Sequence, residues 1–178
     1  MEDEVNRQSL CQTLPTDIRG RHGKRSGSAA LYRYFPLASL NEVGTSALPC
    51  GTTVETFHQE NRYRCNLWPH TFSASTTHDT KRSEEDVRAR IHVLSEIPHI
   101  WEKKVLQWHA WNLSNKTDGA PINNDEYLLY QTLVGTWPAQ PMARKQFAVY
   151  IDRIKSYMQK AIKEAKWETS WLLYLKGI

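Results

Sequence analysis

A wide stripe of apolar residues near the carboxyl end of the sequence limits the folds open to this chain. Apolar side chains recur there at intervals of three and four residues, as they do along one face of a helix. The stripe comprises Phe147, Tyr150, Ile151, Ile154, Tyr157, Met158, Ala161, Ile162 and Ala165. A helix of this kind is stable in water only when its apolar face is covered. The pattern therefore predicts a helix over residues 146–166 that packs against a core.

A second helix is expected between Ser83 and Pro98. Val87, Ile91 and Leu94 fall on one helical face. Ser83 suits the start of the helix, because its hydroxyl can accept a bond from a free backbone N–H group, and Pro98 ends the segment. The pattern predicts a helix with one buried face.

Three further segments have helical patterns. Trp101, Trp108 and Trp111 recur at helical spacing, and we expect them in the core, although aromatic rings can also form a platform for sugars. Residues 125–137 are apolar on several faces, which predicts a buried helix. The stripe through residues 54–64 is thin, and it gives the weakest helical pattern of the three.

One segment favours a strand instead. Thr71–Thr77 follows Pro69 and is rich in β-branched and small residues, which predicts a short buried strand. The expected fold class is therefore mainly α with a little β. The chain has 178 residues, which suffices for one core, whereas a complete (β/α)8 barrel typically needs about 250.

The amino-terminal end differs in composition from the rest of the chain. Residues 1–29 are polar, with glycines among Ser, Lys and Arg, and they lack a helical or strand period, which predicts a disordered leader. From Leu31 onward aromatic and aliphatic residues are dense. We therefore expect one structured region over residues 30–178.

Charge and cysteine usage disfavour several classes of protein. The net charge is +4, but the one concentrated basic run, from Arg19 to Arg25, lies in the expected leader, so nucleic-acid binding is disfavoured. An odd number of cysteines without a CxxC pair or zinc spacing favours reduced thiols in the cytoplasm. Neither a membrane-spanning apolar run nor a signal peptide is evident, and we expect no metal or cofactor.

The densest group of chemically active side chains is THDTKR, from Thr77 to Arg82. It places His78, Asp79, Lys81 and Arg82 directly after the expected strand, and barrel enzymes build their sites at the carboxyl ends of strands. Spacing alone leaves two interpretations open. Either Asp79 and His78 take part in catalysis, or Asp79 caps a turn beside an ordinary loop histidine and two solvated cations.

Long blocks of the sequence resemble one family. The blocks THDTKRSEEDVRARI, VLSEIP, NNDEYLLYQTLVGTWP and YMQKAIKEAKWETSW occur in the order and at the separations typical of maltooligosyltrehalose synthases. Upstream, LYRYFPLASLNEVG and WPH are similar to the same family. The resemblance runs from Leu31 to Trp171, and it identifies the chain as a carboxy-terminal fragment of a member of the α-amylase clan.

The resemblance implies a fold and a set of roles. Members have a (β/α)8 catalytic barrel, of which this chain would supply the seventh-strand region and the helices that follow. Asp79 would be the third catalytic carboxylate, and His78 would bind substrate beside it. Lys81 and Arg82 would either orient a glucose hydroxyl or hold the loop. The reaction converts a terminal α-1,4 link of a maltooligosaccharide into an α,α-1,1 link, and it needs no cofactor.

Two catalytic groups that the resemblance implies are absent from the sequence. The clan's nucleophile lies in a strand motif of the type RxDH and its acid in a later Glu-containing motif, and neither motif is found. We therefore expect the chain to be inactive alone. The alternatives are a carbohydrate-binding or complementing fragment that joins a separately encoded amino-terminal half, and a non-functional gene remnant.

Overall fold

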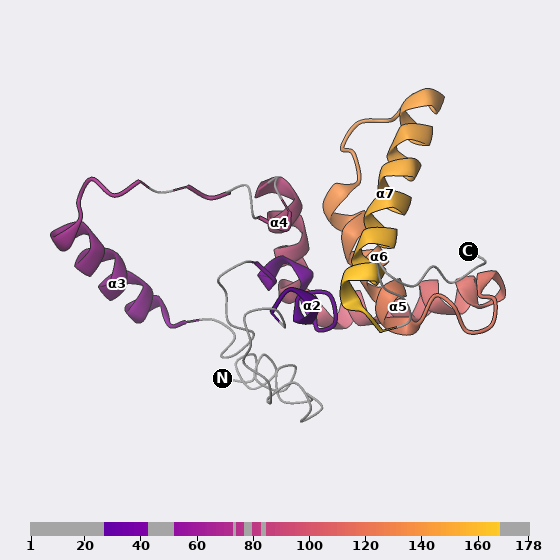
Figure 1. Ribbon diagram of the computed structural model, residues 1–178, viewed down its shortest axis with the longest axis horizontal. Helices are drawn as coiled ribbons and strands as arrows, with labels where there is room; N and C mark the ends of the chain where they lie inside the picture. Colours follow the sequence, from indigo (N-terminus) through magenta and orange to yellow (C-terminus); the bar gives the residue numbers. More distant parts are fainter. Residues whose placement is uncertain (1–26, 43–51, 73, 77–79, 83–84, 168–178) are drawn as a thin grey trace.

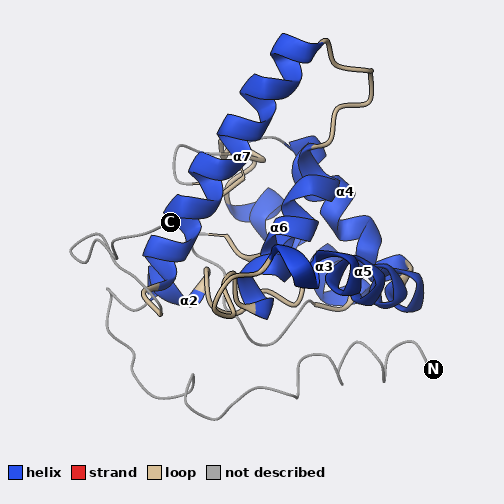
Figure 2. Cartoon of the chain, turned by 90° about the vertical axis from the view of Figure 1, so that its right-hand side faces the viewer, coloured by secondary structure: helices blue, strands red, loops and turns tan. Residues whose placement is uncertain are grey.

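The structure, a computed structural model, describes residues 27–42, 52–72, 74–76, 80–82 and 85–167. Every named element in these ranges is helical (Figure 1) (Figure 2). In chain order the elements are α2 Gly27–Ala30, η2 Ala38–Leu40, α3 Val54–Leu67, α4 Glu85–His92, η3 Val93–Glu96, α5 Pro98–Asn112, η4 Leu113–Asn115, α6 Asn123–Thr136 and α7 Arg144–Ala165.

Helix α6 lies at the centre of the packed part of the chain. It contacts α4, α5 and α7, and Figure 1 shows these helices and the short α2 gathered together. Its buried residues are Asp125, Glu126, Leu128, Tyr130, Gln131, Thr132 and Gly135. The predicted buried helix over residues 125–137 is confirmed.

The first apolar cluster joins the segment 31–42 to α6 and α7. Its buried members are Tyr32, Phe35, Ala38, Leu128, Ala161 and Ala165. The segment 31–42 has little regular structure, yet its aromatic side chains fill the space between two helices. The dense apolar sequence that begins at Leu31 is therefore part of the core.

Gln131 ties the segment 31–42 to α6. This side chain is 0% exposed. Its Oε1 accepts the N–H of Ala38 at 2.7 Å, and its Nε2 donates to the carbonyl of Phe35 at 3.1 Å. Because buried backbone groups need partners, the amide fixes a segment that lacks a helical ladder of its own.

The second apolar cluster lies between α4, α5 and α6. Its buried members are Ile91, Leu94, Trp101 and Tyr130, and Tyr127 packs against both clusters. Trp108 packs against the same group, with its ring centroid 5.8 Å from that of Trp101. The core positions predicted for these two tryptophans are confirmed.

Trp111 departs from the prediction, because it is 66% exposed. It follows Trp101 by ten residues, which rotates its position about 80° away from that side chain around the helix axis. Its neighbours His109 and Asn112 contact α6, whereas position 111 lies outside the face of α5 that is covered. The prediction that Trp111 belongs to the core was wrong for this reason.

Helices α4 and α6 approach closely at Gly135. A Cβ atom at this position would lie 2.9 Å from Cγ1 of Val87 and 3.0 Å from Cδ1 of Ile91. The predicted helix before Pro98 is thus confirmed as α4 and η3, although Ser83 lies outside the described residues. Pro98 itself is the first residue of α5, a position where a missing N–H costs nothing.

Helix α7 confirms the helix predicted over residues 146–166, but it is covered only in part. Ala165, near its carboxyl end, is buried, whereas Phe147 and Val149 in its first turns are exposed. Figure 2 shows this first part rising beyond the other helices. At the opposite end Arg33 donates to the carbonyls of Ala165 and Lys166, which places a cation at the negative end of the helix dipole.

Helix α3 stands apart from the packed helices (Figure 1). Its first turn is capped by the Thr53 hydroxyl, which accepts the N–H of Thr56 at 3.1 Å. None of its residues is buried. The thin stripe of residues 54–64 does form a helix, but that helix has no core beneath it.

The strand predicted over Thr71–Thr77 is absent from the described residues of that segment, 71, 72 and 74–76. A strand needs a neighbouring strand to receive its backbone hydrogen bonds, and the ranges that the structure describes contain none. The expectation of a mainly helical chain is confirmed, and the expected β content is not found there. Residues 1–26 of the predicted leader lie outside the described part, and residues 27–30 form α2.

Candidate functional site

The structure describes one half of the candidate site. His78 and Asp79 lie outside the described residues, whereas Lys81 and Arg82 lie in the short stretch 80–82 that precedes α4. Both of these cationic side chains are half-buried. Contacts from two distant parts of the chain, the segment 31–42 and α7, hold the stretch in place.

Glu42 holds the backbone of this stretch. Its Oε2 accepts the N–H of Lys81 at 2.8 Å, and its Oε1 accepts the N–H of Arg82 at 3.4 Å. Hydrogen bonds to an ionised carboxylate are stronger than those between neutral groups. Glu42 is the last described residue of the segment 31–42, which Gln131 ties to α6. Its hydrogen bonds therefore fix the stretch 80–82 relative to the core.

The guanidinium of Arg82 joins two further elements. One terminal nitrogen donates to the carbonyl of Ala38 in η2 at 2.7 Å, and the other donates to the hydroxyl of Tyr157 in α7 at 3.2 Å. A planar guanidinium with several donors is suited to holding two acceptors at once. We refer to Glu42, Arg82, Ala38 and Tyr157 as the Arg82 anchor.

The ammonium group of Lys81 lies over an aromatic ring. Its Nζ is 5.7 Å from the centroid of the Tyr32 ring, a favourable cation–π arrangement. Burial, followed by the proximity of Tyr157 and Glu164, raises the pKa of Tyr32. The Tyr32 ring therefore stays neutral at neutral pH and presents only its face to the ammonium.

Sequence reasoning missed the partners in the Arg82 anchor. Glu42 has no charged neighbour at helical spacing, and Tyr157 belongs to the apolar stripe of α7. Glu42 lies 39 residues from Lys81, and Tyr157 lies 75 residues from Arg82. The one available signal for Glu42 was its place in the block LYRYFPLASLNEVG.

A second polar cluster lies between α5 and α6, around Glu126, which is 5% exposed. Lys116 Nζ lies 2.7 Å from its Oε2, and His109 Nδ1 lies 2.8 Å from the same oxygen. The hydroxyl of Tyr130 donates to Oε1, and Asn112 donates to that hydroxyl at 3.2 Å. We refer to these residues as the Glu126 cluster.

The pKa values in this cluster follow from its geometry. Burial by itself would raise the pKa of Glu126, but hydrogen bonds from Lys116, Tyr130 and His109 outweigh burial and lower that pKa to about 2. Burial and the bond to Glu126 raise the pKa of Tyr130 to about 12. Since both carboxylate oxygens are engaged by protein side chains, the cluster serves to hold α5 and the turn after it against α6.

Neither a metal-binding group nor a membrane-spanning helix was found in the described ranges. Those ranges contain no group of three or more His, Cys, Asp or Glu side chains arranged to hold a metal ion. The helices described also include none with the length and apolar character needed to cross a bilayer.

The arrangement of helices matches one portion of a class of carbohydrate-active synthases. A hypothetical maltooligosyl trehalose synthase of Sulfolobus tokodaii superposes with a TM-score of 0.70 at 40% sequence identity, over 84% of this chain and 19% of that protein. A second crystal structure, of maltooligosyl trehalose synthase, gives a TM-score of 0.69 at 39% identity, over 82% of this chain and 18% of that protein.

Sequence comparison leads to the same family. A protein of Mycobacterium tuberculosis, provisionally named maltooligosyl trehalose synthase, is 36% identical over 170 residues, which are 96% of this chain and 20% of the relative. No family model matches the sequence. The chain belongs to the maltooligosyl trehalose synthase family, and it spans about one fifth of the length of the relatives it matches. The resemblance seen in the sequence blocks is thereby confirmed.

Proposed function

We propose that this chain contributes one side of the active site of a maltooligosyl trehalose synthase, with Asp79 as a catalytic carboxylate and His78 as its sugar-binding neighbour. The observation that carries the proposal is the Arg82 anchor. It fixes the residues directly after His78 and Asp79 against η2 and α7. A functional group is held best when its supporting residues are locked by packing and hydrogen bonds.

The chemistry gives Asp79 a defined task. Retaining transfer between sugars uses one carboxylate as nucleophile and another as acid and base, through transition states with oxocarbenium character. Asp79 would do neither, and would instead accept hydrogen bonds from ring hydroxyls and stabilise the developing positive charge. His78 would donate a hydrogen bond to the same ring.

The second half of the reaction depends on excluding water. The anomeric hydroxyl of the released glucose would attack the glycosyl intermediate, which converts the α-1,4 link into an α,α-1,1 link. Water in the same position would give hydrolysis instead. The nucleophile and the acid would come from the part of the synthase fold that this chain does not span.

We assign different roles to Arg82 and Lys81. The donors of Arg82 that face Ala38 and Tyr157 support the assignment of Arg82 to holding the loop rather than to contacting sugar. Lys81 is half-buried and its ammonium lies over the Tyr32 ring, a contact worth on the order of 0.5–2 kcal/mol. Lys81 therefore remains the candidate for binding a glucose hydroxyl.

The remainder of the synthase fold would also account for the missing strand. Thr71–Thr77 would become the seventh strand of a (β/α)8 barrel once neighbouring strands accept its backbone hydrogen bonds. The chain would then have two partners. One is the maltooligosaccharide substrate, and the other is the rest of the barrel, supplied either by a separately encoded half or by one continuous chain. The odd number of cysteines and the lack of a CxxC pair support a cytoplasmic location.

A chimera tests the proposal. The matching residues of the Mycobacterium tuberculosis relative are replaced by this chain, and the product is incubated with maltopentaose. We expect a non-reducing trehalosyl product from the chimera, none from this chain alone, and a loss of at least about a hundredfold in kcat for Asp79→Asn, as is common when a charge-stabilising group is removed.

Asp118→Asn is the matched control, since Asp118 is exposed in a turn with φ of 52°, a conformation that Asn also tolerates. It should leave turnover unchanged. Full activity of the Asp79→Asn chimera, or turnover by the isolated chain, would contradict the proposal.

A further inference from the structure

Lys81 is held in place by contacts that leave the donors of its ammonium group unused. Its backbone N–H donates to Oε2 of Glu42 at 2.8 Å. Its side chain is half-buried, and its Nζ lies 5.7 Å from the centroid of the Tyr32 ring. In the described ranges no carboxylate forms an ion pair with this Nζ, and no oxygen accepts a hydrogen bond from it. An ammonium has three N–H donors, which are therefore available to a ligand.

An aromatic ring holds an ammonium group differently from a carboxylate. A carboxylate oxygen accepts hydrogen bonds from the ammonium, and so it occupies the donors. A ring face attracts the positive charge through its quadrupole. An ammonium over a ring can therefore be fixed in position and still donate to the oxygens of a neutral ligand. The hydroxyls of a sugar are acceptors of this kind.

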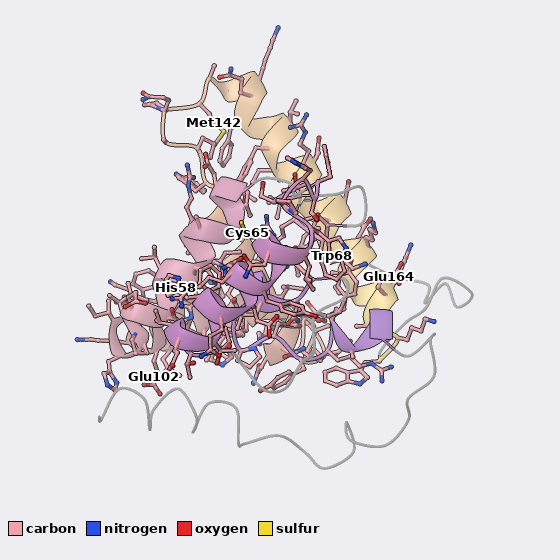
Figure 3. The ribbon with its side chains drawn as sticks, turned by 90° about the vertical axis from the view of Figure 1, so that its left-hand side faces the viewer. His58, Cys65, Trp68, Glu102, Met142 and Glu164 are labelled. Carbon is pink, nitrogen blue, oxygen red and sulfur yellow. The ribbon has the colours of Figure 1, made fainter. Side chains whose placement is uncertain are left out.

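Tyr32 is a rigid support for the ammonium. It is 8% exposed and belongs to the first apolar cluster. Its N–H donates to the carbonyl of Ala29 in α2 at 3.0 Å, and α2 in turn contacts α7. Figure 3 shows Glu164, near the carboxyl end of α7, beside this short helix. Because the ring is packed into the core, the ring determines where the ammonium lies.

We infer that Tyr32 is a positioning residue, which places the ammonium of Lys81 to bind a hydroxyl of the maltooligosaccharide. The inference rests on the proposed function, which leaves Lys81 as the candidate for this contact. Glu42 fixes only the backbone of Lys81, whose four-carbon stem is flexible. A group that is ordered before the ligand arrives loses less entropy on binding. Loss of the ring should therefore weaken substrate binding more than the chemical step.

The kinetics of the chimera with the Mycobacterium tuberculosis relative test the inference. We expect Tyr32→Leu to raise KM for maltopentaose by at least about threefold, within the range of one cation–π contact, and to leave kcat within about twofold. Tyr32→Phe keeps the ring face, so KM should also stay within about twofold. Lys81→Met should remove the effect of Tyr32→Leu on KM, because the ring then has no ammonium to place. An unchanged KM for Tyr32→Leu, or an equal rise in the Lys81→Met background, would overturn the inference.

Phe35→Leu is the matched control for a merely structural role. Phe35 is 3% exposed and lies in the same apolar cluster as Tyr32, but its ring stacks on that of Tyr127. A general loss of packing lowers the fraction of folded enzyme, which reduces the apparent kcat and leaves KM unchanged. A rise in KM for Phe35→Leu as large as that for Tyr32→Leu would assign the effect to packing and overturn the inference.

The isolated chain tests the contact without catalysis. Protons over the face of an aromatic ring are shifted upfield in an NMR spectrum. The Cε protons of Lys81 should therefore lie upfield of those of the other lysines in the original chain and in Tyr32→Phe, and the shift should be lost in Tyr32→Leu. An unshifted Lys81 signal in the original chain would overturn the inference.

The outcomes separate this inference from the proposed function. A chimera whose turnover depends on Asp79, but whose KM does not respond to Tyr32→Leu, keeps the proposed function and loses the inference. A chimera without product contradicts the proposed function, and the Lys81 shift in the isolated chain then decides whether Tyr32 positions the ammonium.

Discussion

Helices α3 and α6 have the same length, 14 residues, and opposite surroundings. Helix α6 lies between α4, α5 and α7, and its residue Leu128 is 2% exposed. Helix α3 has no buried residue. Length and capping are therefore poor guides to which helix is stable, since tertiary packing supplies most of the stability of a helix in a protein.

The chain therefore has two regions that differ in how their helices are covered. The packed region, residues 29–42 and 85–166, holds both apolar clusters, the Glu126 cluster and most of the Arg82 anchor. The α3 arm, which we define as residues 53–72 and 74–76, holds apolar residues that the described part of the chain does not cover. We expect substitutions in the packed region to change the stability of this chain, and substitutions in the α3 arm to do so only within a larger assembly.

The largest effect is expected from Glu126→Ala. This substitution leaves Lys116, Tyr130 and His109 without the carboxylate that they contact, and breaking a buried ion pair from one side typically costs about 3–5 kcal/mol. Urea unfolding followed by near-ultraviolet circular dichroism measures the free energy of unfolding. A loss below about 1 kcal/mol would mean that the cluster does not stabilise the packed region.

The Glu126 cluster should also make the stability of the packed region depend on pH. The folded-state pKa of Glu126 is lowered from 4.5 to about 2. A lowered pKa stabilises the fold above the unfolded-state value, and this contribution is lost as pH falls from about 4.5 towards 2. At about 1.4 kcal/mol for each pKa unit, the loss is about 3 kcal/mol. Glu126→Gln should have a flatter stability profile over this range, and identical profiles would contradict the assignment.

A smaller effect is expected from Gly135→Ala. The added methyl would lie 2.9 Å from Cγ1 of Val87, so α4 and α6 must move apart. Overpacking of this kind costs about 1–3 kcal/mol, from which the better helix propensity of Ala subtracts about 1. Val87→Ala in the same chain should recover part of the loss. Additive effects of the two substitutions, measured by urea unfolding, would show that the contact is relaxed.

The smallest effect is expected from Phe57→Ala in the α3 arm of the isolated chain. Phe57 is already 55% exposed, so truncation should change the free energy of unfolding by less than about 0.5 kcal/mol. Leu128→Ala in α6 is the matched comparison, with an expected loss of about 2–5 kcal/mol. If both substitutions had the same effect in urea unfolding, the division into two regions would not hold.

Most of the helices could be predicted from the sequence, but the candidate site could not be assembled from it. The apolar stripe of α7 and the apolar faces of α4 and α6 are local patterns, and each corresponds to a helix in the structure. Trp111, which is 66% exposed, shows the limit of this reasoning, because helical spacing does not say how wide the covered face of a helix is. The predicted strand at Thr71–Thr77 shows another limit, since strand formation depends on a neighbour that a local pattern does not specify.

The sequence by itself determined the family and the helical elements, because both are recorded in the identity and spacing of nearby residues. The tertiary structure decided that Glu42 and Tyr157 meet Arg82, across separations of 40 and 75 residues. It also decided that α6 is buried and α3 is not. The physical reason is that periodicity specifies which face of a helix is apolar, whereas burial depends on which other surfaces are present to cover that face.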